Sequence, residues 1–236
     1  MKDIDYLKKQ AALKAVGYVE SGMILGLGTG STAWFALEEI GRRIREGRLQ
    51  RIIGIPSSIK TTMDAQKFGI PLGSLDEYPE IDLTIDGADE VDPDLNVIKG
   101  GGGALLREKI LAQNSHRFII IVDESKLSPV LGVKSVVPVE VIPFGSYPVL
   151  KYLKILSANA KLRFDEKNEP FQTDQGNFII DCKFEKLSQP DELAAKLKEK
   201  AGIVEHGLFL GLATDVIVAG EREIQHVIAE RKGHSA

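Results

Sequence analysis

A glycine-rich stretch with three hydroxyl side chains, residues 28–32, stands between a predicted strand and a predicted helix. Glycines allow a tight turn and a close approach of the backbone to a ligand. Free N–H groups at a helix start, with the hydroxyls of Thr29, Ser31 and Thr32, form a natural cradle for an anion such as phosphate. A tight turn with Ser/Thr helix caps accounts for the same residues equally well. The stretch is neither a dinucleotide fingerprint, because Ala33 replaces the third glycine, nor a Walker loop.

Four carboxylates gather directly after the predicted strand 81–85, and they belong to Asp86, Asp89, Glu90 and Asp92. Like charges repel, so a purely structural role is costly if these groups are partly buried. They suit the binding of sugar hydroxyls or of a cation, although an exposed acidic turn would look the same. Their spacing does not match a calcium-binding loop.

A lysine followed by four glycines, residues 99–103, opens directly onto another predicted helix. Consecutive glycines carry a large entropic cost, which makes sense where the chain wraps closely around a ligand. A flexible connector is the other interpretation. Glu108 lies a little over one turn into that helix, where it either reaches the loop or faces solvent between Arg107 and Lys109.

The remaining polar groups give weaker signals. Lys126 ends the segment 123–126, which follows a predicted strand, and it either meets an anion or lies on the surface. Cys182 has no histidine partner in a thiol-enzyme arrangement, so we expect it to be packed in the core. The histidines lack metal-ligand spacing, and we read all of them as structural or surface residues: His116, His206, His226 and His234.

Composition limits the classes of partner. The 236 residues carry a net charge of −4, with 43% hydrophobic and 27% charged residues, which is typical of a globular protein with a real core. No stretch is strongly basic, so we expect no nucleic-acid partner. The longest apolar runs, 118–122 and 216–219, are too short to span a bilayer. A single cysteine and a polar N-terminal segment favour the cytoplasm.

The elements that must position these groups alternate between strand and helix in the first half of the chain. Predicted strands cover residues 23–25, 52–55, 81–85 and 117–122, and predicted helices cover 6–19, 33–45, 59–68 and 104–114. Near-continuous apolar strands between helices predict a mostly parallel sheet covered on both faces. Ligands of such folds bind at the carboxyl ends of the strands, where the loops above converge.

The pattern changes after Pro129. We expect strands at 136–141, 160–164 and 178–184, with helices at 147–156 and 190–201, which together form an α+β insert. Residues 214–218 then predict a strand returning to the first domain, and 221–228 its closing helix. The domain limits that follow are 1–128 with 207–236 for the first domain, and 129–206 for the insert.

Taken together, these segments resemble the type A ribose-5-phosphate isomerases. The similarity is carried by motifs in family order along nearly the whole chain: residues 26–32, 86–90, 99–102 with 107–109, 123–126, 176–181 and 207–209. Each motif alone is of moderate specificity, but the ordered set is highly specific. The resemblance implies a Rossmann-like domain, an inserted ferredoxin-like α+β domain and a homodimer or homotetramer.

The resemblance also implies a reaction and its residues. Ribose 5-phosphate and ribulose 5-phosphate would interconvert through an enediolate, with no metal and no cofactor, and Glu108 would carry the proton. Lys99 and backbone N–H groups would stabilise the charged oxygen, and Asp86 would assist ring opening. The implied substrate-binding set is Lys8, Thr29, Gly30, Ser31, Thr32, Asp86, Gly87, Ala88, Asp89, Lys99, Gly100, Gly101, Gly102 and Lys126.

Three competing interpretations stay open at the level of sequence. A sugar-phosphate sensor without turnover would normally add a DNA-binding module, and the sequence has no basic helix-turn-helix segment. An amino-sugar-phosphate deaminase or a coenzyme A transferase of the same fold would differ in substrate. A divalent-cation enzyme using residues 86–92 would lose activity in a chelator.

Overall fold

The computed structural model describes residues 3–157 and 159–229, so His234 lies outside the described residues. Its largest sheet has the strand order β13-β12-β6-β3-β1-β2. The strands are β1 (Ile24–Leu27), β2 (Ile53–Pro56), β3 (Ile81–Asp86), β6 (Ser115–Asp123), β12 (Asp215–Ala219) and β13 (Ile224–Ile228). Neighbouring strands from β2 to β12 are parallel, and β13 is antiparallel to β12. The predicted mostly parallel sheet is confirmed.

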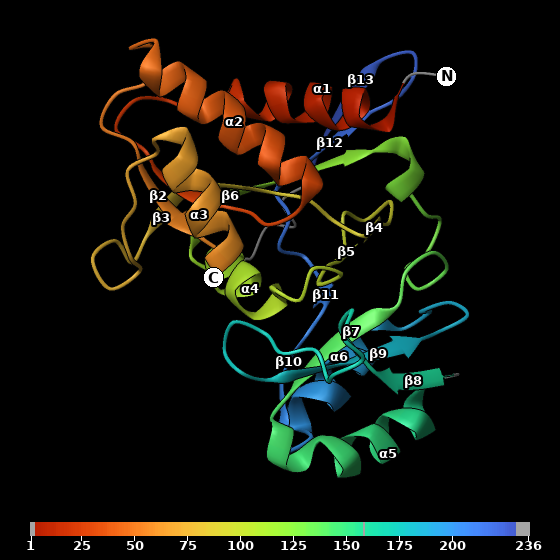
Figure 1. The fold of residues 1–236 in the computed structure, drawn as a ribbon. Helices are drawn as coiled ribbons and strands as arrows, with labels where there is room; N and C mark the ends of the chain where they lie inside the picture. The colour runs from red at the N-terminus through yellow and green to blue at the C-terminus, as the bar shows by residue number, and fades with distance from the viewer. Residues whose placement is uncertain (1–2, 158, 230–236) are drawn as a thin grey trace, which may run out of the picture.

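The long central strand β6 shows how the two faces are covered. Its residues Ile119 and Ile121 pack into the core beneath the first helices, whereas the alternate residues Phe118 and Ile120 pack into a separate core on the other face. The helices are α1 (Ile4–Val16), α2 (Ser31–Arg45), α3 (Ile59–Phe68) and α4 (Leu105–Gln113). Figure 1 shows α1 and α2 side by side over one face of this sheet.

A small sheet covers part of the opposite face, and the sequence analysis did not predict it. It has the order β11-β5-β4, with β4 (Glu90–Val91), β5 (Val97–Ile98) and β11 (Leu208–Phe209). The first two strands form a hairpin within the acidic segment. The third enters after the chain has returned from the insert, so it ties the two parts of the molecule together.

The insert is built from β7 (Val137–Val141), α5 (Ser146–Leu156), β8 (Asn159–Leu162), β9 (Phe178–Lys183), α6 (Pro190–Glu199) and β10 (Ile203–His206). Its antiparallel sheet has the order β10-β7-β9-β8. A β-α-β-β-α-β succession in this order is the ferredoxin-like arrangement, as predicted. Cys182 is buried in its core. The domain limits at 128/129 and 206/207 stay a prediction.

One predicted element is wrong. The segment 221–228 does not close the domain as a helix but forms the edge strand β13. The Gly220 N–H donates a hydrogen bond of 2.9 Å to the Glu223 carbonyl, which closes a tight turn after β12. Ile224, Val227 and Ile228 are β-branched, and β-branched residues favour a strand over a helix.

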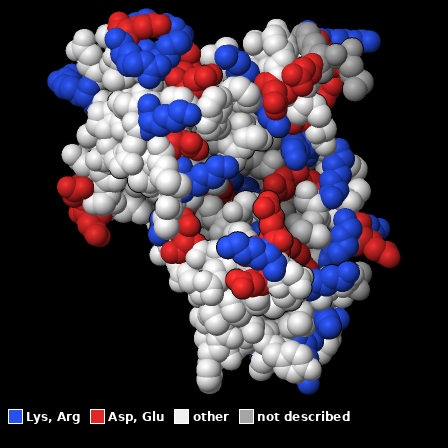
Figure 2. Space-filling view, in the orientation of Figure 1, with Lys and Arg blue, Asp and Glu red and all other residues white. Residues whose placement is uncertain are grey.

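The two parts of the molecule are distinct in outline. Figure 1 places the insert at one end, with α5 farthest from the large sheet. Figure 2 shows a hollow on this face between the two parts, with acidic and basic side chains along it, while the far end of the insert is mostly uncharged. Within the described chain, no helix is both long and apolar enough to cross a membrane.

Candidate active site

The two motifs that end β1 and β3 are hydrogen-bonded to each other at the carboxyl edge of the sheet. The Thr29 N–H donates to Asp86 Oδ1 at 3.1 Å, and the Gly28 N–H donates to the Ile85 carbonyl at 3.1 Å. Any Cβ on Gly28 would lie 2.3 Å from Asp86 Oδ1, so only glycine allows this approach. The predicted convergence of these loops is therefore present.

The hydroxyl of Thr29 belongs to a cluster of hydrogen-bonded hydroxyl groups, which the sequence analysis did not predict. Its Oγ1 lies 2.7 Å from Ser57 Oγ, 2.9 Å from Ser58 Oγ and 2.9 Å from Thr61 Oγ1. Ser57 and Ser58 follow β2 at the same sheet edge, which was the available signal. The cluster anchors the first turn of α3 to the loop after β1.

The start of α2 offers open polar groups beside this cluster. Gly30 has a φ of 116° and precedes the helix without a side-chain cap, so the N–H groups of the first turn stay available. The side chains of Ser31 and Thr32 make no hydrogen bond within the described residues. A cavity of about 130 Å³, lined in part by Gly30, Ser31 and Lys60, opens between α2 and α3.

The glycine turn after β5 approaches from the other side. The Gly101 N–H donates to Asp89 Oδ2 at 2.8 Å, and the Lys99 side chain donates to the Gly87 carbonyl at 2.6 Å. Gly102 lies near Thr29, since a Cβ placed on it would be 3.9 Å from Thr29 Cγ2. The structure thus brings the three predicted motifs into one site.

Three charged side chains form a buried cluster in this site. Asp86, Lys99 and Glu108 are only 1%, 2% and 4% exposed. Lys99 Nζ lies 2.9 Å from Asp86 Oδ2 and 3.4 Å from Glu108 Oε2. Neither carboxylate oxygen satisfies the geometry of a hydrogen bond with a described residue. Glu108 therefore does not face solvent, and its Oε2 could still accept a hydrogen bond.

The charge balance in the cluster raises the pKa values of its members. Burial raises the pKa of Glu108 to about 8, with Asp86 and Asp89 adding to the effect against the opposing Lys99 ammonium. Burial also raises the pKa of Asp86, again against Lys99. For Lys99, burial favours the neutral amine, but Asp86 and Glu108 outweigh it and raise the pKa. A carboxyl group with a pKa near 8 suits proton transfer near neutral pH.

The acidic segment divides into two functional halves. Asp86 and Asp89 belong to the site. Glu90 is buried and accepts hydrogen bonds from backbone N–H groups of the segment before β7, among them that of Ser135 at 2.8 Å. Asp92 accepts from the Asn96 N–H at 2.9 Å and so closes the β4–β5 hairpin. Among the described residues, no group of His, Cys, Asp and Glu side chains is arranged to hold a metal ion.

Two lysines of the predicted set are not joined to this cluster by any hydrogen bond or ion pair of the described chain. Lys126 ends the short 3₁₀ helix η1 (Glu124–Lys126) after β6, which is the same edge of the sheet. Lys8 lies on α1 and pairs with Asp5 at 3.1 Å. Their assignment to the substrate's phosphate stays a prediction.

The insert supplies contacts to the site that sequence reasoning missed. Arg163, just after β8, donates to the carbonyls of Gly100 and Gly101. Phe171 packs where a Cβ on Gly103 would lie, at 2.4 Å, and Gly103 has a φ of 78°. Asp174 accepts from the Ile59 N–H at the start of α3 at 2.7 Å. Arg163 lies in the predicted strand 160–164, Phe171 and Asp174 lie in the polar stretch after it, and no motif marked them.

Comparisons with known proteins agree with this geometry. The family model of ribose 5-phosphate isomerase A (phosphoriboisomerase A) matches residues 53–223. The chain is 53% identical to ribose-5-phosphate isomerase A of Chloroflexus aurantiacus, over 93% of this chain and 92% of that protein. It is 52% identical to the enzyme of that name from Desulfatibacillum aliphaticivorans, over 97% of this chain and 100% of that protein.

Solved structures give the same result. A D-ribose-5-phosphate isomerase in complex with phospho-erythronic acid superposes with a TM-score of 0.93 and 39% identity, over 96% of this chain and 100% of that one. The ribose 5-phosphate isomerase A of Methanocaldococcus jannaschii superposes with a TM-score of 0.90 and 40% identity, with the same coverage. The chain belongs to the ribose 5-phosphate isomerase A family.

Proposed function

We propose that this protein interconverts ribose 5-phosphate and ribulose 5-phosphate, as the names of its relatives state for those proteins. The observation that carries the proposal is Glu108, a buried carboxyl group with a pKa raised to about 8, 3.4 Å from a lysine ammonium at the open edge of the sheet. Family membership indicates the substrate, and the environment of Glu108 indicates a base suited to the reaction.

The proposed chemistry is a proton transfer between adjacent carbons. The Glu108 carboxylate removes the proton from C2 of the open-chain aldose, and the electron pair moves toward the C1 carbonyl oxygen to give an enediolate. The C2 hydroxyl proton passes to the C1 oxygen, and the same carboxyl group returns its proton to C1 as the C2 oxygen becomes the carbonyl. One base serves both carbons, and a positioned base is typically worth about 10²–10⁴-fold in rate.

Binding groups surround that base. Lys99 and the N–H groups of the glycine turn would stabilise the charge that develops on oxygen. Asp86 and Asp89 would hold sugar hydroxyls, and Asp86 would assist ring opening. The free helix start at Gly30, with Ser31 and Thr32, would bind the phosphate, and Lys126 and Lys8 would add positive charge. Phosphate binding far from the reacting carbons would orient the substrate.

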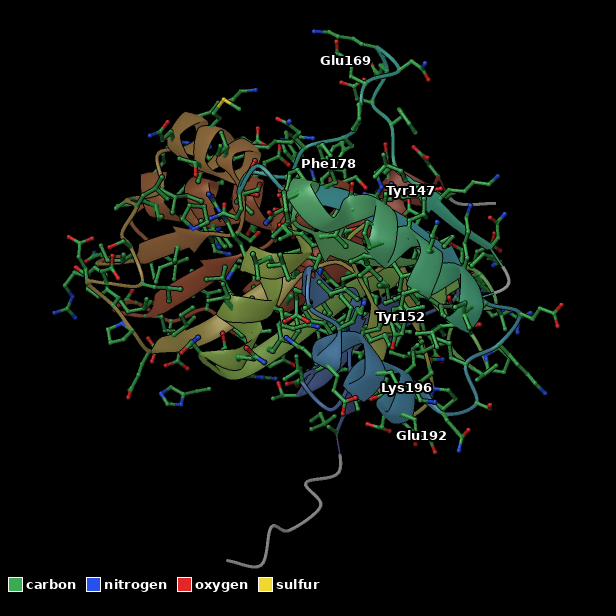
Figure 3. All side chains as sticks on the ribbon, turned by 90° about the horizontal axis from the view of Figure 1, so that it is seen from below. Tyr147, Tyr152, Glu169, Phe178, Glu192 and Lys196 are labelled. Carbon is green, nitrogen blue, oxygen red and sulfur yellow. The ribbon has the colours of Figure 1, made fainter. Side chains whose placement is uncertain are left out.

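The test is a turnover assay of ribose 5-phosphate in the presence of EDTA, with Glu108→Gln beside the wild type. We expect wild-type turnover and a loss of about 10²–10⁴-fold in kcat for the variant, because the amide cannot accept the proton. Glu169→Gln is the matched control, since Glu169 is exposed at a loop tip that extends away from the body of the molecule (Figure 3). A folded wild type without turnover would contradict the proposal, and an active Glu108→Gln would move the base elsewhere.

We also propose a homodimer or homotetramer. The support is the mostly uncharged end of the insert, where Phe144 is 98% exposed, Ile155 84% and Tyr147 64%. Large apolar side chains exposed on α5 and the turn before it are typical of an association site. Light scattering after size exclusion would measure the mass, and a monomer at micromolar concentration would contradict the proposal.

The proposed location is the cytoplasm. The support is the single cysteine, Cys182, which is free and buried, as expected where thiols stay reduced. Cell fractionation followed by the turnover assay tests it, and activity confined to a membrane or secreted fraction would contradict it.

A further inference from the structure

The loop that joins β8 to β9, residues 163–177, reaches from the insert to the active site. It contacts the glycine turn through Arg163 and Phe171 and the first turn of α3 through Asp174. Figure 3 shows that its tip, at Glu169, extends away from the body of the molecule, while Phe178 lies back at its base. The contacts are therefore made by residues on either side of the tip, and not by the tip itself.

Arg163 is held in one geometry on the side of the insert. Its Nε and Nη2 donate to the two oxygens of Asp181 at 2.9 and 2.5 Å. The side chain is largely buried, with 14% exposure. A bidentate arginine–carboxylate pair fixes the plane of the guanidinium as well as its position. The third nitrogen, Nη1, is consequently aimed in a fixed direction.

That nitrogen is hydrogen-bonded to two consecutive carbonyl groups of the glycine turn. Arg163 Nη1 donates to the Gly100 carbonyl at 3.0 Å and to the Gly101 carbonyl at 3.1 Å. In a trans peptide the carbonyl and the following N–H point in opposite directions. Holding the two carbonyls toward Arg163 therefore turns the N–H groups of Gly101 and Gly102 away from it, toward the site.

The two N–H groups have different partners. The Gly101 N–H donates to Asp89 Oδ2 at 2.8 Å, which fixes that carboxylate. The Gly102 N–H makes no hydrogen bond within the described part of the chain, and Gly102 is exposed at the site. Within the turn, the Gly103 N–H donates to the Gly100 carbonyl at 3.0 Å. Glycines add little conformational preference of their own, so the contacts with Arg163 help to select the arrangement.

We propose that Arg163 is a positioning residue for the isomerisation: it orients the glycine turn so that the Gly102 N–H meets the oxygen that gains charge in the enediolate. The inference rests on the proposed function. The insert is then part of the catalytic machinery, through a side chain that does not touch the substrate.

The experiment compares the wild type, Arg163→Met, Arg163→Lys and Asp181→Asn in steady-state kinetics. Losing one oxyanion donor costs roughly 10²–10³-fold in kcat, and a turn that is merely loosened should lose about tenfold to a hundredfold. We expect Arg163→Met to show this fall in kcat with KM within about threefold, because the phosphate and hydroxyl contacts persist. Arg163→Lys should recover part of the rate, and Asp181→Asn should lose less than Arg163→Met.

The affinities of two small-molecule probes distinguish a misoriented glycine turn from a general loss of structure in the binding site. Phospho-erythronic acid carries a carboxylate that resembles the charged enediolate, whereas erythritol 4-phosphate has the same phosphate and hydroxyls without that charge. Arg163→Met should weaken the binding of phospho-erythronic acid by about the same factor by which it lowers kcat/KM. It should leave the affinity for erythritol 4-phosphate unchanged. Arg48→Met, at an exposed arginine beyond the C-terminal end of α2, should change neither.

The outcomes are distinguishable. An active wild type with an equally active, folded Arg163→Met contradicts this inference alone, and so does a rise in KM with kcat intact. Equal weakening of both probes contradicts it too, because it indicates general damage. If Arg163→Met fails to fold by circular dichroism, Asp181→Asn decides, and an unchanged kcat there overturns the inference. A wild type without turnover contradicts the proposed function and this inference with it.

Discussion

Two neighbouring residues of α4, Glu108 and Lys109, enter two different buried charge clusters. On one side Glu108 meets Lys99 and Asp86 in the active site. On the other, Lys109 Nζ lies 2.8 Å from Glu205 Oε1 and donates to the His206 carbonyl at 2.6 Å. Both clusters are buried, and each contains a lysine–carboxylate pair. Burial and pairing are therefore not what distinguishes the active site.

The difference lies in the sign of the excess charge. The active-site cluster has the carboxyls of Asp86, Asp89 and Glu108 around one ammonium, and the pKa of Glu108 rises to about 8. In the second cluster Glu205 lies between the ammonium groups of Lys109 and Lys198. There, burial acts to raise the pKa of Glu205, but the two lysines and the His206 N–H outweigh it and lower it to about 2. The surrounding carboxylates add to burial in raising the pKa of Glu108, whereas the surrounding ammonium groups lower the pKa of Glu205.

The two clusters also differ in whether their buried carboxylate oxygens have hydrogen-bond partners. Asp86 Oδ2 and Glu108 Oε2 are buried without a hydrogen bond to a described residue, whereas both Glu205 oxygens accept one. Unsatisfied buried atoms are costly and are expected where a ligand completes the set. The anchor joins α4 to β10 of the insert, and so holds the helix that carries the base.

The largest effect is expected from breaking the anchor. Lys109→Met leaves Glu205 without its buried partner, and breaking a buried ion pair from one side costs about 3–5 kcal/mol of unfolding free energy. Chemical denaturation measures the loss. The variant Lys109→Met/Glu205→Met, in which both charges are gone, should regain much of the stability, because it buries no lone charge. Equal instability of the single and double variants would show that the pair is not the cause.

The next effect is expected from the active-site lysine. Lys99→Met removes the cation that opposes the carboxylates and donates toward the developing oxyanion. We expect kcat to fall by roughly 10²–10³-fold, the usual cost of a lost oxyanion donor. The pKa of Glu108 should rise further, since Lys99 is what lowers it. A folded Lys99→Met with a rate near that of the wild type would show that the two clusters do not differ in function.

Much of this comparison could be predicted from sequence. The glycine-rich and acidic motifs follow apolar strands, and parallel strands bring their carboxyl ends to one edge, so the meeting of residues 28–32 with residues 86–89 follows from topology. Lys99 as the partner of the aspartates follows from charge alone. Glu108 is different, because its side chain at that helix position could equally face solvent, and only the family resemblance selected it.

The rest depends on contacts that no local pattern encodes. Arg163 lies just after β8 and Asp181 lies on the neighbouring β9, and the arginine meets residues about sixty positions earlier in the chain. Nothing in the sequence near Glu205 shows that it lies between lysines from two different helices. The edge strand β13 was mistaken for a helix because an exposed strand has no buried periodicity to mark it.

The two clusters should respond to pH in opposite directions. The folded state raises the pKa of Glu108 from 4.5 to about 8, so its contribution to stability is complete below pH 4.5 and is lost as the pH rises through 8. The folded state lowers the pKa of Glu205 from 4.5 to about 2. The contribution of Glu205 to stability is therefore present above pH 4.5 and is lost as the pH falls toward 2. Denaturation across pH should show Glu108→Gln flattening only the upper slope and Glu205→Gln only the lower one.

The rate should follow the same titration. Because the reaction needs the Glu108 carboxylate, kcat/KM should rise about tenfold per pH unit below its pKa and level off above about 8. Lys109→Met should leave this midpoint in place if the anchor is electrostatically separate from the base. A midpoint that moves with Lys109 would mean that the two clusters titrate as one.

The smallest effect, and the sharpest test of the charge argument, is the removal of one surrounding carboxylate. Asp89 helps to raise the pKa of Glu108, but less than burial and Asp86 do. In Asp89→Asn the amide oxygen can still accept the Gly101 N–H, so the glycine turn keeps its hydrogen bond while one negative charge is lost. The midpoint of the kcat/KM profile should therefore move to lower pH by less than about one unit, as expected for a secondary charge. A move to higher pH, or none in a variant that still binds phospho-erythronic acid, would mean that the charge of Asp89 does not help to raise the pKa of Glu108.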